Sequence, residues 1–165
     1  MTKILKTHCL INLKNLIHNY KHTADLTEKK VICVIKADAY GHGAVAVAKA
    51  LENEGCDMFA VSCFGEAMEL RDSGISSSIL ILGRIMPDEI YDAIKNGFSF
   101  SVGSVAFLKE IVSCGITKMK AKVHIKLNTG MNRTGFDAVH CPAFGNCNQF
   151  HIQNGVCIYE LGISA

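Results

Sequence analysis

Lys36 is the first residue whose position suggests chemistry, because it directly follows the apolar run Val31–Ile35. The carboxyl end of a parallel strand is where both open α/β sheets and α/β barrels place their active sites. A lysine there attacks an aldehyde only as a neutral amine, a state that an apolar strand end near other cations favours. The alternative is a lysine whose ammonium extends into solvent at the rim of the sheet.

The residues after this lysine, ADAYGHG, predict a turn into a helix. Gly41 and Gly43 flank that turn, and the amino end of a helix directs backbone N–H groups outward, which suits a phosphate. Tyr40 offers a hydroxyl donor to the same group, or it is a packed residue at the edge of the loop. For His42 we favour a solvated loop histidine.

A second cationic cluster lies in HIKLNTGMNRTGF, where Lys126 and Arg133 bracket a turn indicated by residues 128–130. If both charges face one cavity they repel, so the site favours an anionic substrate, an anionic cofactor oxygen or modification of the lysine. The alternative is that the two side chains point to opposite sides of the loop and are solvated.

The cysteines and histidines do not predict a metal site. The segment HCPAFGNC brings His140, Cys141 and Cys147 close in sequence, but no second closely spaced pair completes a tetrahedral set. The eight cysteines are scattered, without a CxxC pair, and are interpreted as reduced thiols of a cytosolic protein.

Alternating short apolar runs and amphipathic segments define the fold class. The runs that predict strands are 31–35, 58–62, 79–82, 98–102 and 121–127. Their starts are spaced as in βα units of a parallel sheet with helices outside. Periodicity alone leaves open whether the sheet stays open or closes, although five strands, or six with one from 150–158, are too few for an eight-stranded barrel.

Glycine and helical spacing mark the segments between these strands. Residues 44–51 show an apolar face and stop at Gly55, and a second helix from Glu66 closes at Gly74. Pro87 suits the first turn of a third helix, and Ser104 is placed to cap a fourth. A further helix precedes the first strand in INLKNLIHNYKHTADL.

The composition is that of a globular protein. The chain has 165 residues, 49% hydrophobic and 19% charged, with a net charge of +2. We expect neither a nucleic-acid nor a membrane partner, because the basic excess typical of nucleic-acid binding is absent. Asn12, Lys14 and Asn15 interrupt any apolar segment long enough for a signal peptide, so we expect a cytoplasmic location.

Two of these motifs together resemble a known family. VIKADAYGHG and IKLNTGMNRTGF, at this separation, are similar to the amino-terminal part of alanine racemase, from INLKNLIHNYK through Phe136. The resemblance implies part of a TIM (β/α)8 barrel, about five or six strands of eight. It also implies pyridoxal 5'-phosphate as cofactor and the interconversion of L-alanine and D-alanine for peptidoglycan synthesis.

The resemblance also implies roles for individual residues. Lys36 forms a Schiff base with the cofactor and is the catalytic base for the D-enantiomer. Tyr40 contacts the cofactor phosphate, and Arg133 contacts the phenolic oxygen of the cofactor and the substrate carboxylate. Lys126 matches a lysine that many family members carry as a carbamate, an anion able to pair with Arg133. The second base is a tyrosine from the partner subunit of a homodimer.

The chain departs from the family pattern in several places. Asn128 stands where the family usually has aspartate, and the Thr-His pair expected near the next strand is absent from FHIQNGVCIYELGISA. We therefore expect an incomplete barrel over 1–136 and a divergent or irregular tail over 137–165. The carboxyl-terminal β-domain is expected to be absent and the truncated chain to be inactive alone. The alternatives are a non-catalytic barrel fragment and a racemase or decarboxylase of the same fold type acting on another amino acid.

Overall fold

The computed structural model describes residues 9–114, 121–128, 130 and 132–137, together with the backbone of 151–153 and 156–158. The helices are α1 (Leu13–Thr27), α2 (Lys36–Gly41), α3 (Ala44–Glu52), α4 (Phe64–Asp72), α5 (Ile90–Lys95) and α6 (Val105–Ser113). The strands are β1 (Cys33–Val34), β2 (Met58–Val61), β3 (Ser78–Ile81), β4 (Ser99–Val102), β5 (Lys122–Ile125), β6 (His151–Gln153) and β7 (Val156–Ile158).

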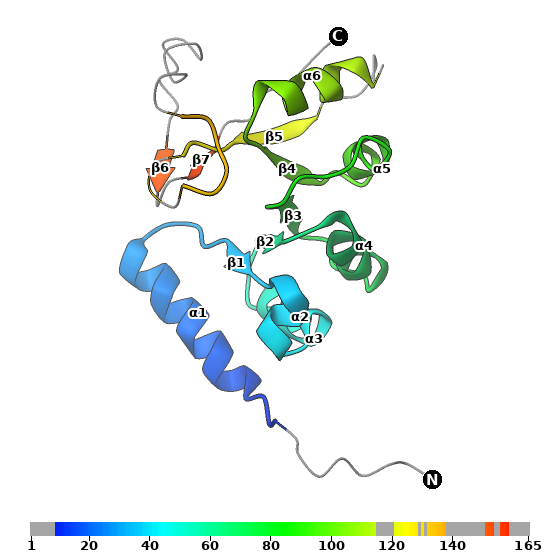
Figure 1. Cartoon of the computed structure of the whole chain (residues 1–165). Helices are drawn as coiled ribbons and strands as arrows, with labels where there is room; N and C mark the ends of the chain where they lie inside the picture. The colour runs from blue at the N-terminus through cyan, green and yellow to red at the C-terminus, as the bar shows by residue number, and fades with distance from the viewer. Residues whose placement is uncertain are drawn as a thin grey trace.

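Strands β1 to β5 form one parallel sheet in the order of the chain, β1-β2-β3-β4-β5. Figure 1 shows helices α3 to α6 along one side of this sheet, with α1 next to α3 at the β1 end. Leu13, Leu16, Ile17 and Tyr20 of α1 pack against the same core as those helices. Each strand is joined to the next by a helical crossover, the arrangement that parallel pairing requires. The predicted partial α/β barrel with five parallel strands is confirmed.

Alternation along the strands sorts their side chains onto the two faces of the sheet. One face packs under the helices and forms a continuous core with them, which from the strands includes Phe59, Val61, Ile79, Ile81, Phe100, Val102, Val123 and Ile125. Burying one large apolar side chain of this kind stabilises the fold by roughly 1.5–3 kcal/mol. The carboxyl ends of all five strands are therefore fixed relative to one another by the core beneath them.

Two side chains cap helices. Ser104 caps α6, as predicted, by accepting a hydrogen bond from the Phe107 N–H at 3.2 Å. Asn12, which was not predicted as a cap, caps α1 by accepting from the Asn15 N–H at 3.1 Å. Both caps satisfy amide groups that have no partner inside their helix.

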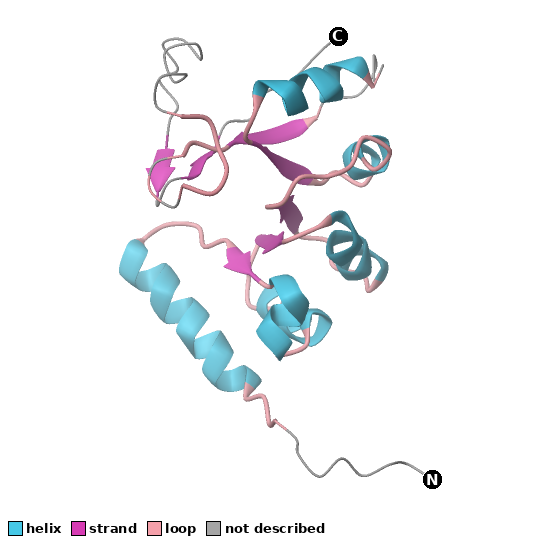
Figure 2. Cartoon of the chain, in the orientation of Figure 1, coloured by secondary structure: helices cyan, strands magenta, loops and turns pink. Residues whose placement is uncertain are grey.

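Some boundaries differ from the prediction for identifiable reasons. Helix α4 begins at Phe64 rather than Glu66, because the extended Cys63 is its first flanking residue. Helix α5 begins at Ile90, since Pro87 lies in the turn that precedes it. The segment 150–158, in which one further strand was expected, contains two short antiparallel strands, β6 and β7, which are not hydrogen-bonded to the parallel sheet. Figure 2 shows this pair beside the β5 edge of the sheet, where β7 contacts β5.

Two properties concern the described residues alone. None of their helices is long and apolar enough to span a bilayer. Their five cysteines with described side chains, Cys9, Cys33, Cys56, Cys63 and Cys114, are free thiols, as the prediction of reduced cysteines requires. The predicted tail and the segment with His140, Cys141 and Cys147 lie largely outside the described residues.

Candidate functional site

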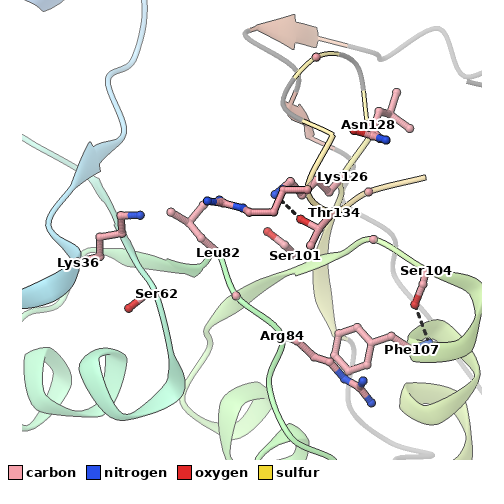
Figure 3. A pocket seen from close by; sticks show the side chains of 16 residues that line it. Lys36, Ser62, Leu82, Arg84, Ser101, Ser104, Phe107, Lys126, Asn128 and Thr134 are labelled. Carbon is pink, nitrogen blue, oxygen red and sulfur yellow. Dashed lines mark hydrogen bonds between the residues drawn. The ribbon is translucent and has the colours of Figure 1, made fainter. Parts of the chain in front are cut away.

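A cavity of about 920 Å³ opens at the carboxyl ends of the parallel strands. Its lining includes Lys36 after β1, Ser62 after β2, Leu82 after β3, and Lys126 and Arg133 from the segment after β5. Figure 3 shows Lys36 on one side of the cavity and Lys126 on the other, with the side chains of Leu82 and Ser101 between them. Strands at the two edges of the sheet thus contribute amines to one space.

The backbone after Lys36 adopts a left-handed turn. Ala37, Asp38, Ala39 and Tyr40 have φ values of 50°, 54°, 51° and 55°, although none of them is glycine. The left-handed conformation costs an L-residue roughly 1–2 kcal/mol through the approach of Cβ to the following carbonyl oxygen. Four such residues in succession therefore need contacts from outside the turn to hold them.

Hydrogen bonds tie both ends of this turn to its surroundings. At its start, the Ile35 N–H donates to the Ala60 carbonyl of β2 at 2.9 Å, which extends the β1–β2 ladder. At its end, Asp38 accepts the Gly43 N–H on its backbone oxygen at 3.0 Å and the Ala44 N–H on Oδ1 at 2.6 Å. The carboxylate of Asp38 thus accepts the hydrogen bond of the first N–H of α3, at the helix end where the sequence suggested a phosphate.

A third contact reaches the turn from the neighbouring βα unit. Glu66, in the first turn of α4, accepts the Ala37 N–H on Oε1 at 2.9 Å. Its Oε2 accepts the N–H and the hydroxyl of Ser62 at 2.7 and 2.8 Å. Burial raises the pKa of Glu66, but the hydrogen bonds from Ser62 and Ala37 and the charge of Lys36 outweigh it, leaving that pKa below its ordinary value.

The second amine of the cavity has a different environment. Lys126 Nζ donates to Thr134 Oγ1 at 2.7 Å. Burial and the nearby positive charge of Arg133 both lower the pKa of Lys126. Both side chains line the same cavity, which favours the interpretation that the two cations face one space.

The loop that carries Arg133 closes back on the end of β5. The Phe136 N–H donates to the Lys126 carbonyl, and the Asn128 N–H donates to the Phe136 carbonyl, both at 2.8 Å. Asn128 Nδ2 also donates to Asp137 Oδ1 at 3.0 Å. Gly135, with φ of 131°, permits this closure, because a Cβ there would lie 2.7 Å from the Asn128 nitrogen.

A second glycine allows two strand ends to approach. At Gly83, directly after β3 and Leu82, a Cβ would lie 2.3 Å from the Ser62 carbonyl oxygen. The Gly83 N–H donates to that same oxygen at 3.1 Å. The floor of the cavity between β2 and β3 is consequently backbone, with little side-chain bulk.

The structure brings together some of the predicted site residues and not others. Lys36, Lys126 and Arg133 line one cavity, whereas Tyr40 is 61% exposed and is not among the lining residues. The Lys36 ammonium lies 6.0 Å from the centre of the Tyr40 ring. His42 is exposed, as predicted, and its Nδ1 lies 2.9 Å from the Ala39 carbonyl oxygen.

Sequence reasoning missed Glu66, Ser62 and Thr134 as members of the site. The available signal for Glu66 was an acidic residue in the first turn of the helix that follows a strand, next to the strand-end sequence SCFGE. Thr134 stands beside Arg133 in a loop whose path gives no periodic signal. Its contact with Lys126 depends on the loop closing back on β5.

Comparisons with known proteins agree on one family. The family model described as alanine racemase, N-terminal domain, matches residues 11–151. Alanine racemase 1 of Caldanaerobacter subterraneus subsp. tengcongensis is 40% identical over 133 residues, which is 79% of this chain and 34% of that protein. Alanine racemase of Aquifex aeolicus is 42% identical over 135 residues, 80% of this chain and 38% of that protein.

Solved structures give the same result. The alanine racemase of Clostridium difficile 630 superimposes with a TM-score of 0.70 at 43% identity, over 76% of this chain and 34% of that one. The chain thus spans about a third of the length of the relatives it matches. With the family model matching most of its residues, the chain belongs to the alanine racemase family, in the N-terminal domain.

Proposed function

We propose that this chain supplies the lysine-bearing part of an alanine racemase that uses pyridoxal 5'-phosphate. The observation that carries the proposal is the cavity with Lys36 on one side and Lys126 and Arg133 on the other. A cofactor with an aldehyde needs an amine to bind it, and its anionic oxygens need cations. The family membership of the chain supports the same activity.

The residues present fit this cofactor in chemistry and in space. Lys36 offers an amine at a strand end, and the cavity volume of about 920 Å³ is within the range that cofactor sites have. Backbone at Gly83 replaces side-chain bulk on the cavity floor. When bound, pyridoxal phosphate withdraws electrons from the α-carbon of an amino acid and so makes its α-proton removable.

Each cation has a proposed task. Lys36 would hold the cofactor through Nζ, and the same atom would accept or return the α-proton on the face of D-alanine. Arg133 orients anionic groups, the phenolic oxygen of the cofactor and the substrate carboxylate, with its guanidinium. Tyr40 remains a proposed phosphate contact, although it does not line the cavity.

For Lys126 we propose carbamylation. A lowered pKa increases the neutral fraction of its amine, the form that attacks carbon dioxide. A nitrogen–carbon bond forms, a proton is released, and the resulting carbamate is an anion beside the Arg133 guanidinium. The modification would replace repulsion between two cations by an ion pair.

Inversion of an α-carbon requires a proton carrier on each face of the substrate. Lys36 serves one face, and among the described residues that line the cavity none is a tyrosine. We therefore propose a homodimer of the whole cytoplasmic protein, in which a tyrosine of the partner subunit serves the other face. Residues 1–165 alone should exchange the α-proton of alanine without inverting it.

Attachment of the cofactor is tested first. The chain is incubated with pyridoxal phosphate, reduced with borohydride and digested for mass spectrometry, with Lys36→Ala as the test variant and Lys49→Ala as the matched control. We expect the pyridoxyl group on Lys36 in the wild-type and Lys49→Ala chains. Labelling spread evenly over surface lysines would contradict the proposal.

Proton transfer is tested second, by proton NMR of D-alanine or L-alanine with the loaded chain in deuterium oxide. We expect loss of the α-proton signal from D-alanine at least tenfold faster than from L-alanine, without formation of the opposite enantiomer. Lys36→Ala with added pyridoxal phosphate gives the background rate. Equal exchange of both enantiomers would contradict the role of Lys36 as the base for D-alanine.

A further inference from the structure

The left-handed turn at residues 37–40 decides where the lysine before it can point. The turn begins at the residue directly after Lys36 and contains no glycine. L-residues leave this conformation readily unless the surroundings hold them. Any group that fixes the turn therefore also fixes the direction in which the Lys36 side chain leaves the backbone.

Glu66 is the contact that reaches the turn at its first residue. Its Oε1 accepts the Ala37 N–H at 2.9 Å, and its Oε2 accepts the Ser62 N–H and hydroxyl at 2.7 and 2.8 Å. Ser62 itself lines the cavity beside Lys36. One carboxylate thus joins the ends of β1 and β2 at the edge of the cavity.

The charge state of Glu66 suits this task. A carboxylate is an acceptor only, and both of its oxygens are used here by donors. Although burial raises the pKa of Glu66, the hydrogen bonds from Ser62 and Ala37 and the charge of Lys36 lower it below its ordinary value, so these contacts favour the carboxylate. A glutamine in the same place keeps one acceptor oxygen and brings a donor to the other position, so it cannot serve both sets of donors.

We propose that Glu66 is a positioning residue for Lys36: its carboxylate holds the left-handed turn against β2 and so directs the Lys36 amine into the cavity. This inference rests on the proposed attachment of the cofactor to Lys36. The role differs from a general contribution to stability, because loss of Glu66 should reduce the reactivity of Lys36 and leave that of other lysines unchanged.

The experiment compares Glu66→Gln with Glu69→Gln, an exposed glutamate on the same helix. Each chain is labelled with pyridoxal phosphate and borohydride, and the rate at Lys36 is divided by the rate at exposed Lys49 in the same molecules. We expect this ratio to fall roughly tenfold in Glu66→Gln, the effect of one to two lost charge-assisted hydrogen bonds, and to stay unchanged in Glu69→Gln.

A milder variant guards against loss of folding. Ser62→Ala removes one donor and leaves the Ser62 N–H on Oε2 and the Ala37 N–H on Oε1. Its ratio should lie between those of the wild-type and Glu66→Gln chains. If Glu66→Gln does not fold, an unchanged ratio in Ser62→Ala would overturn the proposal.

Hydrogen exchange of the cofactor-free chain gives an independent measurement. We expect amides of 37–43 to exchange roughly tenfold faster in Glu66→Gln, while those of β3 and β4 keep the wild-type rate. A labelling ratio that does not change in folded Glu66→Gln would overturn the positioning role. If the wild-type chain shows no preference for Lys36, the proposed function fails, and unchanged exchange at 37–43 would then overturn the role of Glu66 as well.

Discussion

The strand ends that carry Lys36 and Lys126 occupy equivalent places in the sheet but have opposite electrostatic neighbours. Beside Lys36 lies the carboxylate of Glu66, whose pKa the lysine helps to lower. Beside Lys126 lies the guanidinium of Arg133, which together with burial lowers the pKa of the lysine. The sheet thus provides the position of each amine, while the charged neighbours come from different places: Glu66 from α4, after β2, and Arg133 from the loop after β5.

The two ends also differ in how they are held. The turn after Lys36 is tied to β2, α3 and α4 by hydrogen bonds from three directions. The loop after Lys126 is closed mainly on itself, through Phe136 and the Asn128–Asp137 contact. The backbone that carries Lys36 is thus held from several sides, whereas at the other end the Lys126 amine itself is held, by Thr134 of its own loop.

The largest effect should come from a substitution in the core that aligns the strand ends carrying Lys36 and Lys126. Phe100 is fully buried on β4, in register with Ile81 of β3 and Val123 of β5. Phe100→Ala should lower the free energy of unfolding by about 3–5 kcal/mol, because it leaves a cavity in the core that aligns the strand ends. Urea denaturation measures this, with Val112→Ala on the exposed face of α6 as control. A loss below about 1 kcal/mol would mean that this core does not fix the strands.

Acid should weaken the Lys36 end selectively. Because the folded pKa of Glu66 is lowered, its contribution is present above the ordinary value of 4.5 and is lost as pH falls through the folded pKa. The difference in unfolding free energy between wild-type and Glu66→Gln chains should therefore shrink from about 1–3 kcal/mol at pH 7 as the pH falls below 4.5 and through the folded pKa of Glu66. Denaturation at several pH values measures it. A difference independent of pH would show that the charge of Glu66 is irrelevant.

The sequence predicted the strands and the helix stops but not the contacts between βα units. The five strands and most helix stops followed from apolar spacing and glycine, since both are local properties of the chain. Lys36 and Lys126 were found because a strand end has a known place in the fold. The contact between Glu66 and Ala37 joins two βα units, so no local pattern announces it.

The left-handed turn was missed for a related reason. Its residues, Ala37 to Tyr40, are ordinary L-residues, and glycine is the usual signal for positive φ. The conformation is imposed by contacts from Ala60, Asp38 and Glu66. Strained backbone of this kind is expected at functional sites, where the global structure overrides local preference.

The hydrogen bond that closes the loop after Lys126 can be tested by introducing one negative charge at Asn128. Asn128→Asp replaces the donor that reaches Asp137 with a second carboxylate. We expect a loss of about 0.5–1.5 kcal/mol in the free energy of unfolding at pH 7, measured by urea denaturation, because a hydrogen bond is replaced by repulsion between two carboxylates. Asn132→Asp makes the same charge change at an exposed position of the loop. An equal loss in both variants would indicate a general charge effect.

The smallest effect concerns the pair of cations. Arg133→Ala removes one of the two causes that lower the pKa of Lys126, while burial remains. The pH profile of Lys126 acetylation should therefore move to higher pH, without a matching movement of the profile of Lys36. Mass spectrometry of both lysines in one digest measures this. Equal movement of both profiles would contradict the distinction between the two strand ends.

The turn at residues 37–40 has a further consequence, in terms of chirality. Positive φ values near 50° are strained for L-residues and relaxed for their mirror images. Ala37 is exposed, so its Cβ can change sides without disturbing the core. A chain assembled chemically with D-alanine at position 37 should therefore hold the Lys36 segment with less strain than the natural chain. At position 37, beside the candidate active site, the backbone conformation therefore favours a D-residue over an L-residue.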